Sequence, residues 1–163
     1  MNTVNQKSEI PLRILKIGHC PSISGKSTLT YHIGCNEDGD IHIRIHANSA
    51  AGMFSQEWVS WTAIEETLSR HVTGFTSAAF RGLIKGKSQN NAGFMLAVLL
   101  QEQLVIKEGD QKRSYTCLDS GAFLDQINRL LASDVSLQAD DNPTNPKPES
   151  PKNSKPKAVS IKK

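Results

Sequence analysis

The 163-residue sequence contains no long hydrophobic run, and none of its apolar stretches approaches the roughly 18 consecutive residues that a membrane-spanning helix needs. Residues 1–9 are polar and lack the apolar core of a secretory signal. We therefore expect a cytoplasmic protein that has no membrane partner.

Cysteine is also scarce. The three cysteines, Cys20, Cys35 and Cys117, are odd in number and widely separated. This pattern argues against a secreted scaffold held by disulfides and favours reduced thiols, with a Cys20–Cys35 disulfide as the alternative.

Recognisable catalytic motifs are missing. The stretch Gly18–Thr28 ends in Gly-Lys-Ser-Thr, as phosphate-binding loops do, but six residues separate Gly18 from Gly25 where such a loop has four. The following residues alternate like a strand, whereas a phosphate-binding loop leads into a helix. We interpret this stretch as a loop between strands. No spacing singles out a nucleophile with a base or a pair of carboxylates, so we expect no enzyme, no catalytic residues and no cofactor.

Positive charge is concentrated at the C-terminal end. The chain has a net charge of +3, while residues 147–163 alone contain six lysines and one acidic residue. Five of the seven prolines also lie beyond residue 140, and a segment of this composition buries too little apolar surface to fold. We therefore predict a disordered N-terminus over 1–9, a β-hairpin or small sheet over 10–54, a helical region over 55–133 and a disordered basic tail over 134–163.

The N-terminal region has the alternation of an antiparallel hairpin. Thr28–Ile33 and Ile41–His46 alternate polar with apolar residues around a turn-rich segment, and Leu12–Ile17 is a candidate third strand. With Ile33 placed opposite Ile41, one face of the sheet is apolar. Its six residues are Leu29, Tyr31, Ile33, Ile41, Ile43 and Ile45.

The opposite face of this hairpin carries three histidines, His32, His42 and His46. In the same register His32 lies opposite His42, which could form part of a metal site, although the spacing matches no zinc pattern and we predict no metal. A nucleic-acid-facing or partner-facing surface with Thr30, Arg44 and Lys26 and an ordinary solvated face are the other two interpretations.

The sequence of the central region, from residue 55 to residue 132, predicts several short helices. Ser55 is a candidate cap for a helix that ends near His71, and Thr76 for a second helix through Ile84. Ser88 is a candidate cap for a third helix over 91–103. Strand-like runs at 104–107 and 113–118 follow, and a closing helix over 120–132 ends the folded part.

Two short helices, a tight turn, a longer helix and a hairpin form the outline of a winged helix-turn-helix. Over residues 56–118 the chain resembles this superfamily in the order of its elements and in Leu99–Ile106, where the helix runs into the first strand of the wing. The resemblance implies an α+β protein in which a small antiparallel sheet packs with a winged helix-turn-helix. It also implies double-stranded DNA as a partner, with the third helix in the major groove and the wing on the backbone.

The DNA-binding candidates follow from this resemblance and from the positive charge of residues 75–91, which include no acidic residue. The polar residues of the turn are able to contact bases or phosphates, and those of the wing are assigned to phosphates. The complete candidate set is Arg81, Lys85, Lys87, Ser88, Gln89, Asn90, Asn91, Lys107, Lys112 and Arg113.

One segment does not fit a helix that lies in a DNA groove. Residues 92–100 are apolar on all sides, so that this segment is either buried within the fold or part of a protein interface. Two hypotheses therefore stand. The first is a DNA-binding accessory or transcription-regulatory protein whose basic tail is an electrostatic tether. The second is a protein-interaction adaptor that uses helix 92–100 or helix 120–132, as a homodimer or with another protein, and has no direct role with nucleic acid.

Overall fold

The structure, a computed structural model, describes residues 12–86, 88–109 and 113–139. The fold is α+β, with a four-stranded antiparallel sheet in the order β1-β2-β3-β4 and a separate two-stranded hairpin. The strands of the sheet are β1 (Arg13–Pro21), β2 (Thr28–Cys35), β3 (Ile41–Asn48) and β4 (Val59–Ser60). The helical elements are α1 (Trp61–Arg70), the 3₁₀ helix η1 (Ser77–Leu83), α2 (Asn90–Gln101) and α3 (Gly121–Ala132), and the hairpin strands are β5 (Val105–Lys107) and β6 (Tyr115–Cys117).

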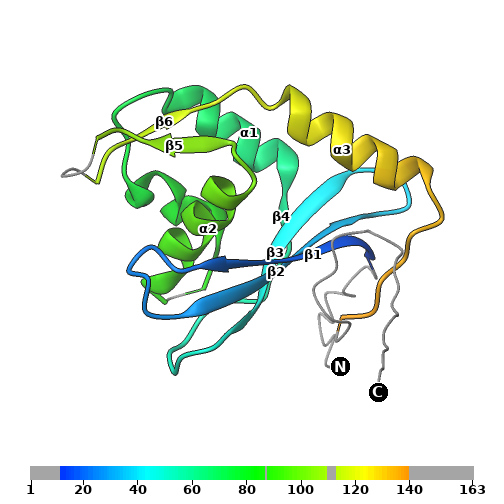
Figure 1. Ribbon diagram of the computed structural model, residues 1–163, viewed down its shortest axis with the longest axis horizontal. Coiled ribbons are helices and arrows are strands. Elements are labelled where there is room, and N and C mark those ends of the chain that lie inside the picture. Colours follow the sequence, from blue (N-terminus) through cyan, green and yellow to red (C-terminus); the bar gives the residue numbers. More distant parts are fainter. Residues whose placement is uncertain (1–11, 87, 110–112, 140–163) are drawn as a thin grey trace, which may run out of the picture.

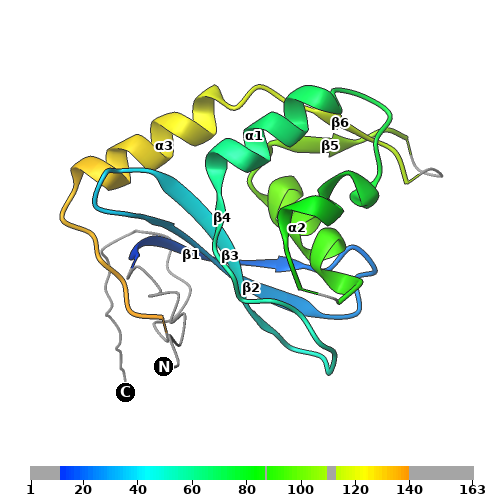
Figure 2. The ribbon, with the colours of Figure 1, turned by 180° about the vertical axis from the view of Figure 1, so that it is seen from behind.

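The three α-helices and the hairpin lie on one side of the sheet (Figure 1). Seen from behind, α3 runs along the top of the molecule, while α2 lies between the sheet and the β5–β6 hairpin (Figure 2). One hydrophobic core joins the layers, since its buried side chains extend from Leu15 in β1 to Ile127 in α3. No helix of the described residues is long and apolar enough to cross a membrane.

The predicted apolar face of the sheet is confirmed, but its register is shifted. Leu29, Tyr31, Ile33, Ile43 and Ile45 are all buried against the helices. Ile33 pairs with Ile43, and it is Cys35 that pairs with Ile41. The hairpin is therefore two residues longer than we predicted, because Asn36 closes the turn by hydrogen bonds to Asp40. A shift of two residues leaves every side chain on its predicted face.

The start of the first helix differs from the sequence prediction. Ser60, and not Ser55, is the N-cap of α1, and its hydroxyl accepts a hydrogen bond from the Ala63 amide at 3.2 Å. The preceding residues are extended because Val59 and Ser60 pair with β3 as strand β4, which the sequence pattern did not reveal. Thr76 caps η1 as predicted.

The end of the folded region also lies beyond the predicted boundary. Residues 134–139 had been assigned to the tail, yet Leu137 donates its amide to the Ile14 carbonyl at 2.9 Å and extends the edge of β1. The Arg13 side chain donates to the Val135 carbonyl at 2.6 Å and also to carbonyls at the C-terminal end of α3, including that of Leu131 at 3.2 Å. The prediction of a disordered tail over 140–163 and of a disordered segment over 1–9 concerns residues outside the described ranges.

Candidate nucleic-acid interface

Helix α2 is the element around which the predicted DNA-binding residues are arranged. Its side chains from Phe94 to Leu99 are all buried, so the apolar segment 92–100 is an interior helix and not a free surface. This burial agrees with the interpretation that the segment is apolar on all sides because it lies within the fold. Polar candidates are consequently found only near the two ends of α2, which are about 18 Å apart for 12 residues at 1.5 Å each.

The first group of candidates surrounds the N-terminal end of α2. Arg81, Lys85, Gln89 and Asn90 are exposed there. A cavity of about 190 Å³ at this end is lined by Arg81 and Gln89 among others. Ser88 lies beside them, and its hydroxyl donates to the Met53 carbonyl and accepts from the Asn90 amide.

Asn91 has a different role from its neighbours because only 4% of it is exposed. Its amide oxygen accepts a hydrogen bond from the Ser55 main chain at 2.8 Å, and its amide nitrogen donates to the Gly86 carbonyl at 3.4 Å. The side chain thus joins the loop before α1 to the loop before α2. Lys87 and Lys112, two further candidates, lie outside the described residues.

The second group lies near the C-terminal end of α2, where Lys107 and Arg113 line a cleft of about 580 Å³. Both side chains are exposed, and neither makes an ion pair or a side-chain hydrogen bond with any residue in the described ranges. The neighbouring Glu108 belongs to the other face of the hairpin, where its carboxylate accepts hydrogen bonds from Ser114 and Thr116. Among the described residues, no acidic side chain lines the cleft.

The other walls of this cleft come from α2 and from the loop between β1 and β2. Leu100 and Gln101 of α2 line it, as do Ser22, Ile23 and Ser24 of the loop. This is the stretch whose letters resemble a phosphate-binding loop. As predicted it leads into a strand, β2, and not into a helix.

The loop itself is a compact turn. The Gly25 amide donates to the Ser22 carbonyl and the Ser27 carbonyl accepts from the Ser22 amide, both at 2.9 Å. Gly25 has φ of +76°, a conformation that favours glycine. Ile23 is held outward at the tip with 41% of its surface exposed, and Lys26 is exposed beside it.

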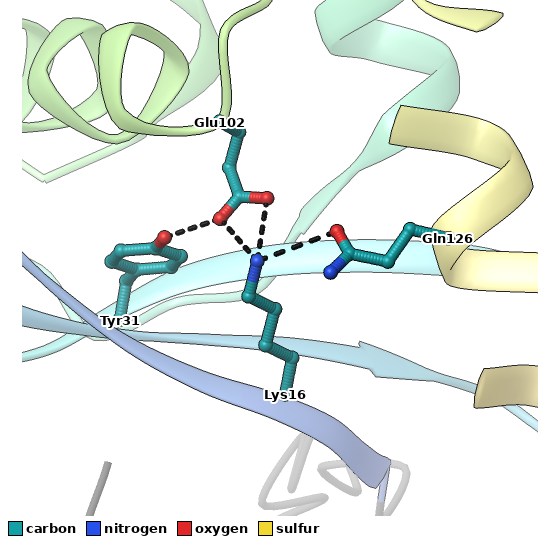
Figure 3. Close-up of polar contacts among 4 residues, drawn as sticks. All are labelled: Lys16, Tyr31, Glu102 and Gln126. Carbon is teal, nitrogen blue, oxygen red and sulfur yellow. Dashed lines mark hydrogen bonds and ion pairs between the residues drawn. The ribbon is translucent and has the colours of Figure 1, made fainter. Parts of the chain in front are cut away.

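A buried polar cluster behind the cleft was not predicted from the sequence (Figure 3). Lys16 of β1 donates to both carboxylate oxygens of Glu102 at 2.9 Å, and to the Gln126 side chain of α3 at 3.4 Å. The Tyr31 hydroxyl donates to the same Glu102 carboxylate. Lys16 interrupts the apolar run Ile14–Ile17. A charged residue in such a run is the sequence signal that could have indicated one member of this cluster.

Burial and the Glu102 charge together determine the ionisation of the groups in this cluster. Burial, with Glu102 as the second cause, raises the pKa of the Tyr31 hydroxyl far above its usual value of 10.0. The same two causes raise the pKa of the Cys20 thiol to about 12. Both groups are therefore neutral at physiological pH. The hydrogen bonds among Lys16, Tyr31, Glu102 and Gln126 join β1 and β2 to α3 and to the end of α2.

The histidine face of the sheet differs from the predicted arrangement. His32 pairs across the strands with Arg44 and not with His42, because the hairpin register is shifted by two residues. His32 instead stacks on His46 with ring centroids 4.3 Å apart, and its Nδ1 accepts a hydrogen bond from the Arg44 side chain at 3.2 Å. Arg44 in turn lies over the Trp58 ring, 4.5 Å from its centroid.

The environment of His32 keeps its imidazole neutral. Burial lowers its pKa from 6.5 to about 3, and the positive charges of His46 and Arg44 act in the same direction. Within the described part of the chain, no group of three or more His, Cys, Asp or Glu side chains is placed to hold a metal ion. The three cysteines are all free thiols.

The chain matches no protein-family model, and it shows no significant similarity to a curated protein or to a solved structure.

Proposed function

We propose that this protein binds double-stranded DNA as an accessory or transcription-regulatory factor, with its basic side chains on the phosphates. The observation that carries the proposal is the cleft lined by Lys107 and Arg113, two cations that share it with no acidic residue among its described lining residues. Cationic side chains that are free of internal partners supply the electrostatic part of DNA affinity.

The positions of the two groups around α2 favour a duplex. Arg81 lines a cavity at the start of α2 and Lys107 lines the cleft near its end, and α2 itself is roughly 18 Å long, somewhat more than the width of about 12 Å of the major groove. Each group would then contact one backbone. Gln89 and Asn90, exposed at the start of α2, are the side chains available to base edges between them.

The winged helix-turn-helix is part of this proposal and supplies its docking geometry. In that arrangement α2 takes the place of the third helix and the β5–β6 hairpin that of the wing. Because the middle of α2 is buried, contact with the groove would be limited to its first turn. We therefore assign most of the affinity to phosphate contacts and only a small part to base recognition.

The test is a fluorescence anisotropy titration of the full chain with labelled duplex DNA at several salt concentrations. The double variant Lys107→Ala/Arg113→Ala removes two phosphate contacts, and the slope of log K against log salt should fall in magnitude by about 2. Arg70→Ala/Arg129→Ala removes the same charge from exposed helix positions away from the cleft and is the matched control. Equal slopes for the two double variants would contradict the assignment of this cleft to DNA.

The tail is tested separately in the intact chain. Replacing the six lysines of residues 147–163 by Gln removes the proposed tether but leaves the described residues unchanged. We expect weaker binding that retains its dependence on Lys107 and Arg113. If all affinity disappears with these lysines, the folded region is not a DNA-binding unit.

A second function, that of a protein-interaction adaptor, is favoured by one observation. Ile106 and Leu118 are 51% and 40% exposed and line a groove of about 460 Å³ between the hairpin and the start of α3, which Glu102, Gln103 and Asp119 also line. Exposed apolar side chains that share a groove are typical of protein interfaces. A complex that persists at high salt and dissociates in Ile106→Lys would support this alternative.

A further inference from the structure

We infer that the cleft between the β1–β2 loop and the β5–β6 hairpin holds an unpaired nucleotide, so that the protein prefers DNA with a single-stranded segment beside a duplex. The inference rests on the proposed function, because it names the part of the DNA that this cleft accepts. It concerns the chemistry of the cleft walls, which differ from those of a surface that contacts phosphates alone.

The lining of the cleft combines cationic and apolar side chains. Lys107 and Arg113 are the cationic residues and are suited to a phosphate group. Ile23 and Leu100 are apolar residues of the same lining. A volume of about 580 Å³ is within the range of roughly 300 to 1,000 Å³ that is usual for small-molecule sites.

The chemistry of the cleft lining matches a nucleotide more closely than it matches a DNA backbone. A phosphate backbone is anionic and hydrated, and it gains nothing from contact with Ile23 or Leu100. The flat face of a base is apolar, and it becomes available only when the base leaves the stacked duplex. Two polar side chains of the lining, Ser24 and Gln101, are able to hydrogen-bond a sugar or a base edge.

The structure of the loop supports a preformed site. Ile23 projects from a turn that is closed by main-chain hydrogen bonds on both sides of it, so its exposure requires no rearrangement. Tyr115, which pairs with Lys107 in the hairpin, is fixed in the core and is 3% exposed. The wall residues are therefore held in place before the ligand arrives, which reduces the entropic cost of binding.

The experiment compares two DNAs that differ only in an unpaired extension, a blunt duplex and the same duplex with a short single-stranded end. For the full chain we expect the extended DNA to bind at least about fivefold more tightly, because Ile23 and Leu100 would bury apolar surface of the unpaired base. Gln101→Trp fills the cleft with a large ring from an exposed helix position, and Asn128→Trp places the same ring on the exposed side of α3 as a control.

The expected result is that Gln101→Trp removes the preference for the extended DNA while Asn128→Trp retains it. Equal affinity for the two DNAs, or a preference that survives Gln101→Trp, would overturn the inference. Blunt-duplex binding that still depends on Lys107 and Arg113 would then leave the proposed function standing, whereas the absence of all DNA binding would remove both.

A competition measurement distinguishes a nucleotide from a bare anion. A nucleoside 5′-monophosphate should displace the extended DNA at a lower concentration than inorganic phosphate does, because only the nucleotide contacts the apolar residues of the lining. Equal competition by the two compounds would show a simple phosphate site and would also overturn the inference.

Discussion

Replacing Glu102 by Gln is expected to destabilise the protein by about 2 to 4 kcal/mol, mainly through the loss of its ion pair with Lys16. The Glu102 side chain is 4% exposed and the Lys16 side chain 14%. Breaking a buried ion pair by removing one partner costs about 3 to 5 kcal/mol, because the other charge stays buried without compensation. Lys16 retains some access to water, so we place the cost slightly lower.

The geometry of the substitution adds to this cost. One of the two Glu102 oxygens, each 2.9 Å from the Lys16 Nζ, becomes an amide nitrogen in Glu102→Gln. Because Lys16 contacts both oxygens, the amide nitrogen faces the Lys16 ammonium in either orientation, and two donors then oppose each other. Neither orientation of the amide therefore satisfies Lys16 as the carboxylate does.

The assay is urea unfolding followed by tryptophan fluorescence, with the free energy compared at unchanged m value. Lys16→Met and the double variant Lys16→Met/Glu102→Gln complete a double-mutant cycle. We expect the double variant to be more stable than Glu102→Gln alone, since it no longer contains the unpaired lysine. A loss below about 0.5 kcal/mol in Glu102→Gln, or an additive cycle, would refute this account of the cluster.

Three further predictions concern stability. Because the pKa of His32 is lowered from 6.5 to about 3, only the unfolded chain takes up its proton between these values. Stability should fall as the pH falls through this window, by at most about 1.4 kcal/mol per pH unit, and His32→Gln should flatten the decline in acid-unfolding curves. Gly18→Ala should cost about 1 to 3 kcal/mol in thermal unfolding, because a Cβ there would lie 2.3 Å from the fixed Tyr31 ring; an unchanged Tm would show that the ring moves freely. Ser60→Ala should lose about 1 kcal/mol with the N-cap of α1, measured by urea unfolding, and a neutral result would contradict the capping role.

Local patterns were sufficient to predict most elements of this fold. Alternation identified the two strands of the N-terminal hairpin and their buried face, and the helices predicted over 91–103 and 120–132 correspond to α2 and α3. The register was two residues off because alternation repeats every two residues and is satisfied equally by both pairings. The start of α1 was wrong because both Ser55 and Ser60 are acceptable caps, and only pairing with β3 decides between them.

The candidate site depended on contacts that no local pattern contains. Lys107 and Arg113 were predicted from the hairpin, but the loop residues opposite them, Ser22 and Ile23, are more than 80 positions away in the sequence. Lys16 and Glu102 are likewise brought together from distant segments. Asn91 resembled its exposed polar neighbours in the sequence, and only the approach of the Ser55 loop accounts for its burial.

The attachment of residues 135–137 to β1 lies at a distance from the cleft. Leu137 is fixed beside Ile14 at one end of β1, whereas Pro21 lines the cleft at the other end of the same strand. Seven residues of strand separate these ends by about 23 Å. Residues 135–137 therefore hold one edge of the sheet without taking part in the cleft, and substitutions that weaken this attachment should leave the cleft unchanged.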